Sequence, residues 1–214
     1  MHSDNRISKI YKLLFKRFGP QHWWPAETRF EVIVGAMLTQ NAAWSNVKKA
    51  IFNLKKAKVL TFDRLLKIDD ARLKQLIRPA GYFNIKTKRL KNLLNFIKSN
   101  YKGDLRIIRR ISIEKIRQEL LSVNGVGKET ADSIILYAFD KPIFVVDAYT
   151  RRVLSRHRLF PSDSSYDEIQ AFICSNLKKN VQVYKEFHAL IVRLGKEYCK
   201  KRKPLCQSCP LREI

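Results

Sequence analysis

Apolar residues recur roughly every three to four positions along most of the chain, which is the spacing of an amphipathic helix. The clearest case is the segment from Arg6 to Phe18, which Gly19 and Pro20 end. The same spacing predicts helices over residues 30–38, 47–54, 62–67, 71–77, 86–100, 113–122, 131–138, 165–177 and 184–198. Seven glycines and seven prolines leave little material for the turns of a β-rich fold. We therefore expect an all-α protein.

The net charge of the chain indicates what kind of partner it binds. The chain has 214 residues, enough for one domain or two small lobes, with 43 basic and 19 acidic side chains and a formal net charge of +24. Hydrophobic residues make up 45% and aromatic residues 11%, which excludes a disordered basic tail. The charge must decorate a folded body, so we expect a polyanionic partner such as nucleic acid.

The chain shows no signal for a membrane or for secretion. The longest stretch without a charge, residues 32–47, contains Thr39, Gln40 and Asn41 and is too polar to span a bilayer. The N-terminus lacks the basic and apolar layout of a signal peptide. We expect a cytoplasmic protein without structural disulfides, associated with the nucleoid if the source is prokaryotic.

Two glycines, Gly125 and Gly127, lie between two predicted helices. Glycines at this position allow a sharp turn, and the backbone N–H groups that follow can then meet a phosphate. This pattern indicates a helix-hairpin-helix element that binds DNA without reading its sequence, although an ordinary turn with no ligand has the same spacing. Twenty residues further on, Asp147 follows the apolar run 143–146 and stands where the cap of the next helix is expected.

A hairpin followed by an aspartate at this spacing resembles the helix-hairpin-helix DNA glycosylases of the endonuclease III superfamily. The resemblance covers nearly the whole chain: residues 38–41 correspond to the family's intercalating loop, and residues 81–86 to a second, degenerate hairpin. It implies a set of residues that contact double-stranded DNA. These are Gly125, Gly127, Lys128, Gln40 and Asn41.

The resemblance also implies two helical lobes. Residues 22–140 would form a six-helix barrel that contains the hairpin, and residues 1–21 with 141–214 would form a second lobe that carries an iron–sulfur loop. DNA would lie across the mouth between them. We expect the protein to be a monomer.

Two positions carry the expected catalysis. Breaking an N-glycosidic bond builds positive charge on the sugar, which the Asp147 carboxylate can stabilise while it orients water, although a plain helix cap is the alternative. Bifunctional members of the family have a lysine at the position of Glu129, and a carboxylate cannot form the Schiff base that leads to strand cleavage. Lys128 lies about 100° away around the helix. We therefore expect a monofunctional enzyme, with a solvated Glu129 as the alternative reading.

All three tryptophans, Trp23, Trp24 and Trp44, lie near the ends of one predicted helix. Enzymes that act on a base flip it into a pocket, and indole rings are the best partners for a cationic ring. We expect these residues and Lys196 to line the base pocket, with core packing as the alternative for the tryptophans. The sequence is most similar to the 3-methyladenine branch of the superfamily.

Three cysteines near the C-terminus, Cys199, Cys206 and Cys209, match the first three of the family's four iron–sulfur ligands. The fourth would stand at position 215, one residue beyond Ile214. We expect a 4Fe–4S cluster, with an incomplete or absent cluster as one alternative. Zinc is the other alternative, but no histidine follows the cysteines in the sequence.

Any lysine or arginine that reaches a phosphate would add salt-sensitive affinity independent of DNA sequence, but most of the basic side chains should simply be solvated. Basic residues are dense in two places. These are Lys86, Lys88, Arg89 and Lys91 after the degenerate hairpin, and Arg193, Lys196, Lys200, Lys201, Arg202 and Lys203 beside the cysteines.

Together these features predict a base-excision repair glycosylase that removes an alkylated purine such as 3-methyladenine. Two alternatives remain. One is an endonuclease III-like glycosylase and lyase that acts on oxidised or mismatched pyrimidines, and the other is a DNA-structure binder without catalysis.

Overall fold

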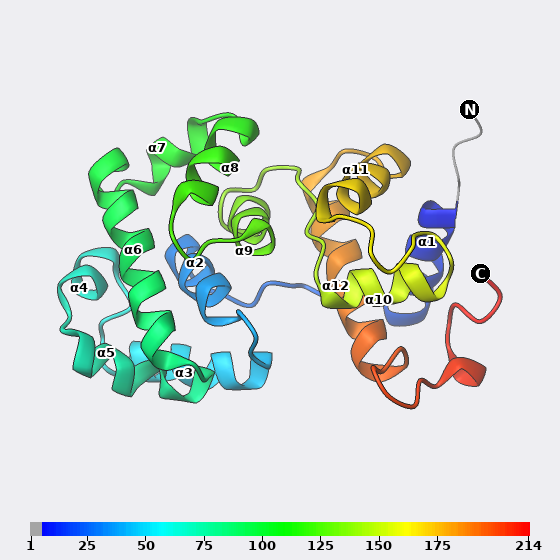
Figure 1. Cartoon of the computed structure of the whole chain (residues 1–214), viewed down its shortest axis with the longest axis horizontal. Coiled ribbons are helices and arrows are strands. Elements are labelled where there is room, and N and C mark those ends of the chain that lie inside the picture. Colours follow the sequence, from blue (N-terminus) through cyan, green and yellow to red (C-terminus); the bar gives the residue numbers. More distant parts are fainter. Residues whose placement is uncertain (1–5) are drawn as a thin grey trace. The chain divides into compact units, whose positions relative to one another are not determined.

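The structure is a computed structural model that describes residues 6–214. The first five residues, which belong to the segment assessed for a signal peptide, lie outside the described residues. From residue 6 onward the structure contains helices and no strand (Figure 1). The α-helices are α1 Arg6–Phe18, α2 Arg29–Leu38, α3 Trp44–Lys56, α4 Phe62–Lys67, α5 Asp70–Ile77, α6 Phe83–Tyr101, α7 Leu105–Arg110, α8 Ile113–Ser122, α9 Lys128–Ser133, α10 Ala148–Arg156, α11 Tyr166–Asn176 and α12 Val181–Glu197.

Three short helices complete the order: the 3₁₀ helices η1, Arg78–Ala80, and η3, Cys206–Ser208, and the π-helix η2, Ile134–Ala138. The expected all-α class is confirmed. Sequence spacing did not predict α7, because its Arg-rich sequence buries a single residue, Ile108, and offers no apolar stripe. Spacing also gave no range for α10, η1 or η3.

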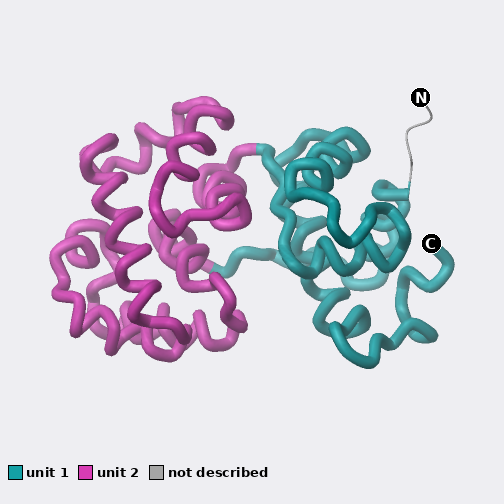
Figure 2. The backbone as a smooth tube through the Cα atoms, viewed as in Figure 1, with its two compact units in different colours: residues 1–25, 142–214 teal, residues 26–141 magenta. Residues whose placement is uncertain are grey.

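The chain divides into two compact units (Figure 2). Unit 1 joins the segment up to Pro25 with Pro142–Ile214, and unit 2 is Ala26–Lys141. The family resemblance predicts these divisions at residues 22 and 140.

Unit 2 is built around α2, in which every residue after Arg29 is buried. The Thr28 hydroxyl caps its first turn by accepting a hydrogen bond from the backbone N–H of Glu31 at 3.1 Å. The π-helix η2 packs on α2, and α6 runs beside it. Because α2 is buried on all sides, it fixes the place where its C-terminal loop, residues 39–43, begins.

Unit 1 is built around α12, which packs against α1 and α10. The approach of α10 is unusually close at Gly195, where an added Cβ would lie 2.3 Å from a ring carbon of Tyr149. This contact positions the start of α10, and therefore Asp147, against the middle of α12.

Candidate active site and DNA interface

The hairpin predicted from the glycines is present in unit 2, between α8 and α9. Gly125 has a φ of +97°, and a Cβ at this position would lie 2.2 Å from Cγ of Arg89. Both the backbone conformation and the close approach of Arg89 therefore require glycine. Arg117 on α8 donates from Nε to Asp132 on α9 at 2.8 Å, and this pair, in which Asp132 is fully buried, ties the two helices together.

Gly127 has a different role. It caps α9 with an extended φ of −94°, and an added Cβ would meet nothing within 4 Å. The folded chain alone therefore does not require glycine here. Lys128 and Glu129 follow as the exposed first two residues of α9, and the Glu129 carboxylate suits the positive end of the helix.

Gln40 holds the 39–43 loop against the hairpin. Its Nε2 donates to the Gly125 carbonyl at 2.9 Å and to the Thr130 hydroxyl at 3.0 Å, and its Oε1 accepts from Arg89 at 2.8 Å. Its neighbour Asn41 is exposed at the tip of the loop, with a φ of +49°. The contacts of Gln40 and Asn41 with DNA stay predictions, but Asn41 has the more accessible side chain.

Among the basic residues after the second hairpin, Lys86 is neither solvated nor accessible to a phosphate. Its side chain is buried, and Nζ donates to the carbonyls of Leu38 and Ala80, both at 2.8 Å. Lys91 is half-buried and donates to backbone carbonyls at the end of α4. In this group only Lys88 is exposed. The density of basic residues in a sequence does not show which of them bind the carbonyls at helix ends and which face solvent.

Asp147 is the N-cap of α10 in unit 1, as predicted, and is only 8% exposed. Its Oδ1 accepts from the backbone N–H and the hydroxyl of Thr150, at 2.7 and 2.8 Å. Its Oδ2 lies 3.6 Å from Nε2 of His188 on α12. Burial alone would raise the pKa of Asp147, but His188 and the Thr150 hydrogen bonds outweigh burial and lower this pKa. The carboxylate is therefore ionised at neutral pH.

His188 is the functional candidate that the sequence analysis did not assign. It is buried in the apolar run of α12, 41 residues beyond Asp147, so that only the tertiary packing of α10 on α12 brings the two together. A histidine in an apolar helix can indicate a functional group, but the sequence does not show which residue it contacts.

Trp23 and Trp24 are half-buried in unit 1, with ring centroids 5.6 Å apart. The exposed Lys196 places Nζ 5.9 Å from the ring centroid of Trp23, so this indole already faces a cation. Trp44 is the first residue of α3 in unit 2. Its predicted place in the same base pocket stays a prediction.

The cysteine loop is held to α10 by two arginines. Arg152 donates to the Cys199 carbonyl at 2.7 Å, and Arg156 lies 3.4 Å from the Cys199 sulfur. Burial raises the pKa of Cys209, and the nearby thiols of Cys199 and Cys206 raise it further. The three thiols are therefore close enough to interact, but the described residues contain no assembled group of three or more metal-ligating side chains.

No helix in residues 6–214 combines the length and the hydropathy needed to span a lipid bilayer.

The chain combines a hairpin between α8 and α9 with a buried aspartate that caps α10, and this combination is typical of DNA repair glycosylases. Residues 34–179 match the HhH-GPD superfamily of base excision DNA repair proteins, so the chain belongs to this superfamily. The resemblance seen in the sequence is confirmed, and the chain is a DNA glycosylase of base excision repair.

Individual relatives agree with this assignment. The chain is 52% identical over 210 residues to MJ1434 of Methanocaldococcus jannaschii, a candidate DNA repair glycosylase, covering 97% of this chain and 94% of the relative. It is 29% identical to endonuclease III of Sulfolobus acidocaldarius, covering 86% of this chain and 80% of that protein.

Two solved structures are also similar. The 3-methyladenine DNA glycosylase MagIII of H. pylori, bound to 1,N6-ethenoadenine, is 31% identical with a TM-score of 0.77, covering 90% of this chain and 97% of that one. A non-covalent endonuclease III–DNA complex shares the fold, with 24% identity, a TM-score of 0.84 and coverage of 99% and 94%.

The two hairpin glycines give a matched test of DNA binding. Gly127→Ala should leave the thermal stability nearly unchanged, because the added methyl meets nothing, and should weaken binding to damaged and undamaged duplexes alike, because the contact is to phosphate. Gly125→Ala should lower the thermal stability. Calorimetry and fluorescence anisotropy measure the two effects. A loss of affinity in Gly127→Ala that is confined to one lesion would contradict a backbone clamp.

Proposed function

We propose that this glycosylase is monofunctional and removes an alkylated purine such as 3-methyladenine from double-stranded DNA, leaving an abasic site. The observation that carries the proposal is the buried Asp147 carboxylate, which Thr150 and His188 keep ionised. The 31% identity to a 3-methyladenine glycosylase supports the choice of substrate class.

The negative charge of Asp147 explains how this residue could promote release of the base. As the base leaves, the deoxyribose becomes an oxocarbenium-like cation, which a fixed carboxylate stabilises more than it stabilises the neutral ground state. Two donors from Thr150 hold Oδ1, so the carboxylate cannot rotate freely. Oδ2, which faces His188 at 3.6 Å, is the oxygen that would meet the sugar or the attacking water. An alkylated base that already carries a positive charge needs little protonation by the enzyme.

A second candidate function is removal of oxidised pyrimidines with strand cleavage. The 29% identity to an endonuclease III favours it. Glu129 opposes the cleavage step, because a carboxylate supplies no amine for a Schiff base.

Asp147→Asn should lower the single-turnover rate of base release by on the order of a hundredfold or more, because it removes the negative charge opposite the sugar. Asparagine caps helices as well as aspartate does, so α10 should still form. Asp69→Asn is the matched control, because Asp69 caps α5 in unit 2 by accepting from Arg72 at 2.8 Å. Near-normal base release by Asp147→Asn would reject the assignment.

Borohydride should trap no covalent adduct between the protein and a lesion-containing duplex, and strands should break only after alkali. Glu129→Lys places an amine at the position used by bifunctional relatives, so this variant should gain a trapped band on a denaturing gel. A strong band with the unaltered protein, retained in Lys128→Ala, would favour the bifunctional alternative.

Substrate choice should depend on the tryptophans. Stacking a cationic base on indole contributes roughly 1–2 kcal/mol beyond a neutral base, about tenfold in discrimination. Trp24→Ala and Trp44→Ala should each impair excision of 3-methyladenine selectively, while Trp24→Phe retains most of it. A panel of single-lesion duplexes measures this. Efficient removal of thymine glycol with 3-methyladenine untouched would support the pyrimidine alternative.

We also propose that Cys199, Cys206 and Cys209 hold three corners of a 4Fe–4S cluster, with a fourth ligand expected at position 215. Its role would be structural, because base hydrolysis requires no electron transfer. A chain that includes a cysteine at this position should absorb at about 400 nm, through charge transfer from thiolate to iron. Colourless protein with stoichiometric zinc would contradict this assignment.

A further inference from the structure

Lys86 on α6 joins two helix ends that are distant in sequence. Its Nζ donates to the carbonyl of Leu38, the last residue of α2, and to the carbonyl of Ala80, the last residue of η1. Both distances are 2.8 Å, and the side chain is 2% exposed. The last carbonyls of a helix have no partner inside it, and a cation there also meets the negative end of the helix dipole.

The amine remains charged under physiological conditions despite its burial. Burial, with the nearby charge of Arg89, lowers the pKa of Lys86 to about 8. The group is therefore mostly protonated at neutral pH and can donate to both carbonyls at once. A buried cation with two charge-assisted hydrogen bonds constrains its partners more tightly than a neutral contact would.

The two carbonyls are the starting points of two exposed loops. Leu38 leads into residues 39–43, with Asn41 at a φ of +49°, and Ala80 leads into Gly81 and Tyr82. Tyr82 is 71% exposed, with a φ of +46°. Exposed residues in the left-handed region keep that conformation only when the surrounding backbone is fixed.

We propose that Lys86 is a positioning residue for lesion recognition, which fixes the 39–43 loop and the Gly81–Tyr82 turn as one rigid element that enters damaged DNA. The inference rests on the proposed glycosylase function. Lys86 itself is too buried to contact DNA, so it acts through the two loops.

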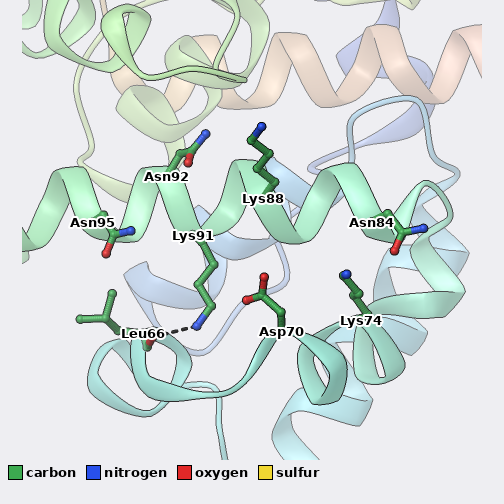
Figure 3. A pocket seen from close by; sticks show the side chains of 8 residues that line it. All are labelled: Leu66, Asp70, Lys74, Asn84, Lys88, Lys91, Asn92 and Asn95. Carbon is green, nitrogen blue, oxygen red and sulfur yellow. Dashed lines mark hydrogen bonds between the residues drawn. The ribbon is translucent and has the colours of Figure 1, made fainter.

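Lys91 provides a matched control on the same helix. Its Nζ donates to the carbonyls of Leu66 and Ile68, at 2.8 and 2.5 Å, and so ties the end of α4 to α6. Figure 3 shows this amine reaching toward Leu66 in a polar cavity between α6 and the α4–α5 segment. The cavity contains none of the predicted base-pocket residues. Removing Lys91 therefore leaves helix-end carbonyls without a donor but disturbs neither candidate DNA loop.

The test compares Lys86→Met with Lys91→Met in the full chain. Both should lower the melting temperature, because each leaves carbonyls unpaired. The duplex carries an uncleavable abasic-site analogue beside 2-aminopurine, whose fluorescence rises when its stacking is broken. Wild type and Lys91→Met should raise this fluorescence, whereas Lys86→Met should not. Lys86→Met should also slow single-turnover excision by on the order of tenfold or more.

The outcomes distinguish a failure of the positioning role of Lys86 from a failure of the proposed glycosylase function. If Lys86→Met raises the fluorescence and excises as Lys91→Met does, the positioning role is wrong while the glycosylase remains. If wild type neither excises any lesion nor binds damaged duplex, the proposed function fails and the inference fails with it. Should Lys86→Met not fold, Lys86→Gln keeps one donor group, and the inference then requires a partial loss of the fluorescence rise.

Discussion

A protein made of helices leaves backbone amides and carbonyls without partners at every helix end, and the candidate site is assembled where side chains satisfy them. Asp147 accepts from the first turn of α10, and Lys86 donates to the ends of α2 and η1. Gln40 does the same for the hairpin carbonyl of Gly125. The groups proposed for catalysis and DNA recognition are therefore groups that the fold also needs for its own stability.

This shared use explains what the sequence could and could not predict. Apolar periodicity located most helices, and the position of Asp147 after an apolar run predicted its capping role. The roles of Lys86 and Lys91 were not predictable, because their acceptors are carbonyls, which every residue carries. The same holds for His188, whose contact with Asp147 depends on how two helices pack.

The buried lysines reduce the part of the net charge that can contact DNA phosphates. Part of the +24 serves carbonyls inside the protein and is not available to phosphates. Counterion release, and with it the salt dependence of DNA affinity, should follow the exposed cations alone. Lys88 and the basic residues 200–203 remain on the surface and are the better candidates for this contribution.

The contact of Tyr149 with Gly195 sets the distance between α10 and α12. Tyr149 lies two residues after Asp147 on the chain, and Gly195 lies two helical turns beyond His188 on α12. The missing side chain at Gly195 thus sets how closely α10 approaches α12, and with it the 3.6 Å gap between the carboxylate and the imidazole. A larger side chain at Gly195 would therefore change the electrostatic environment of the candidate catalytic group without adding or removing a charge.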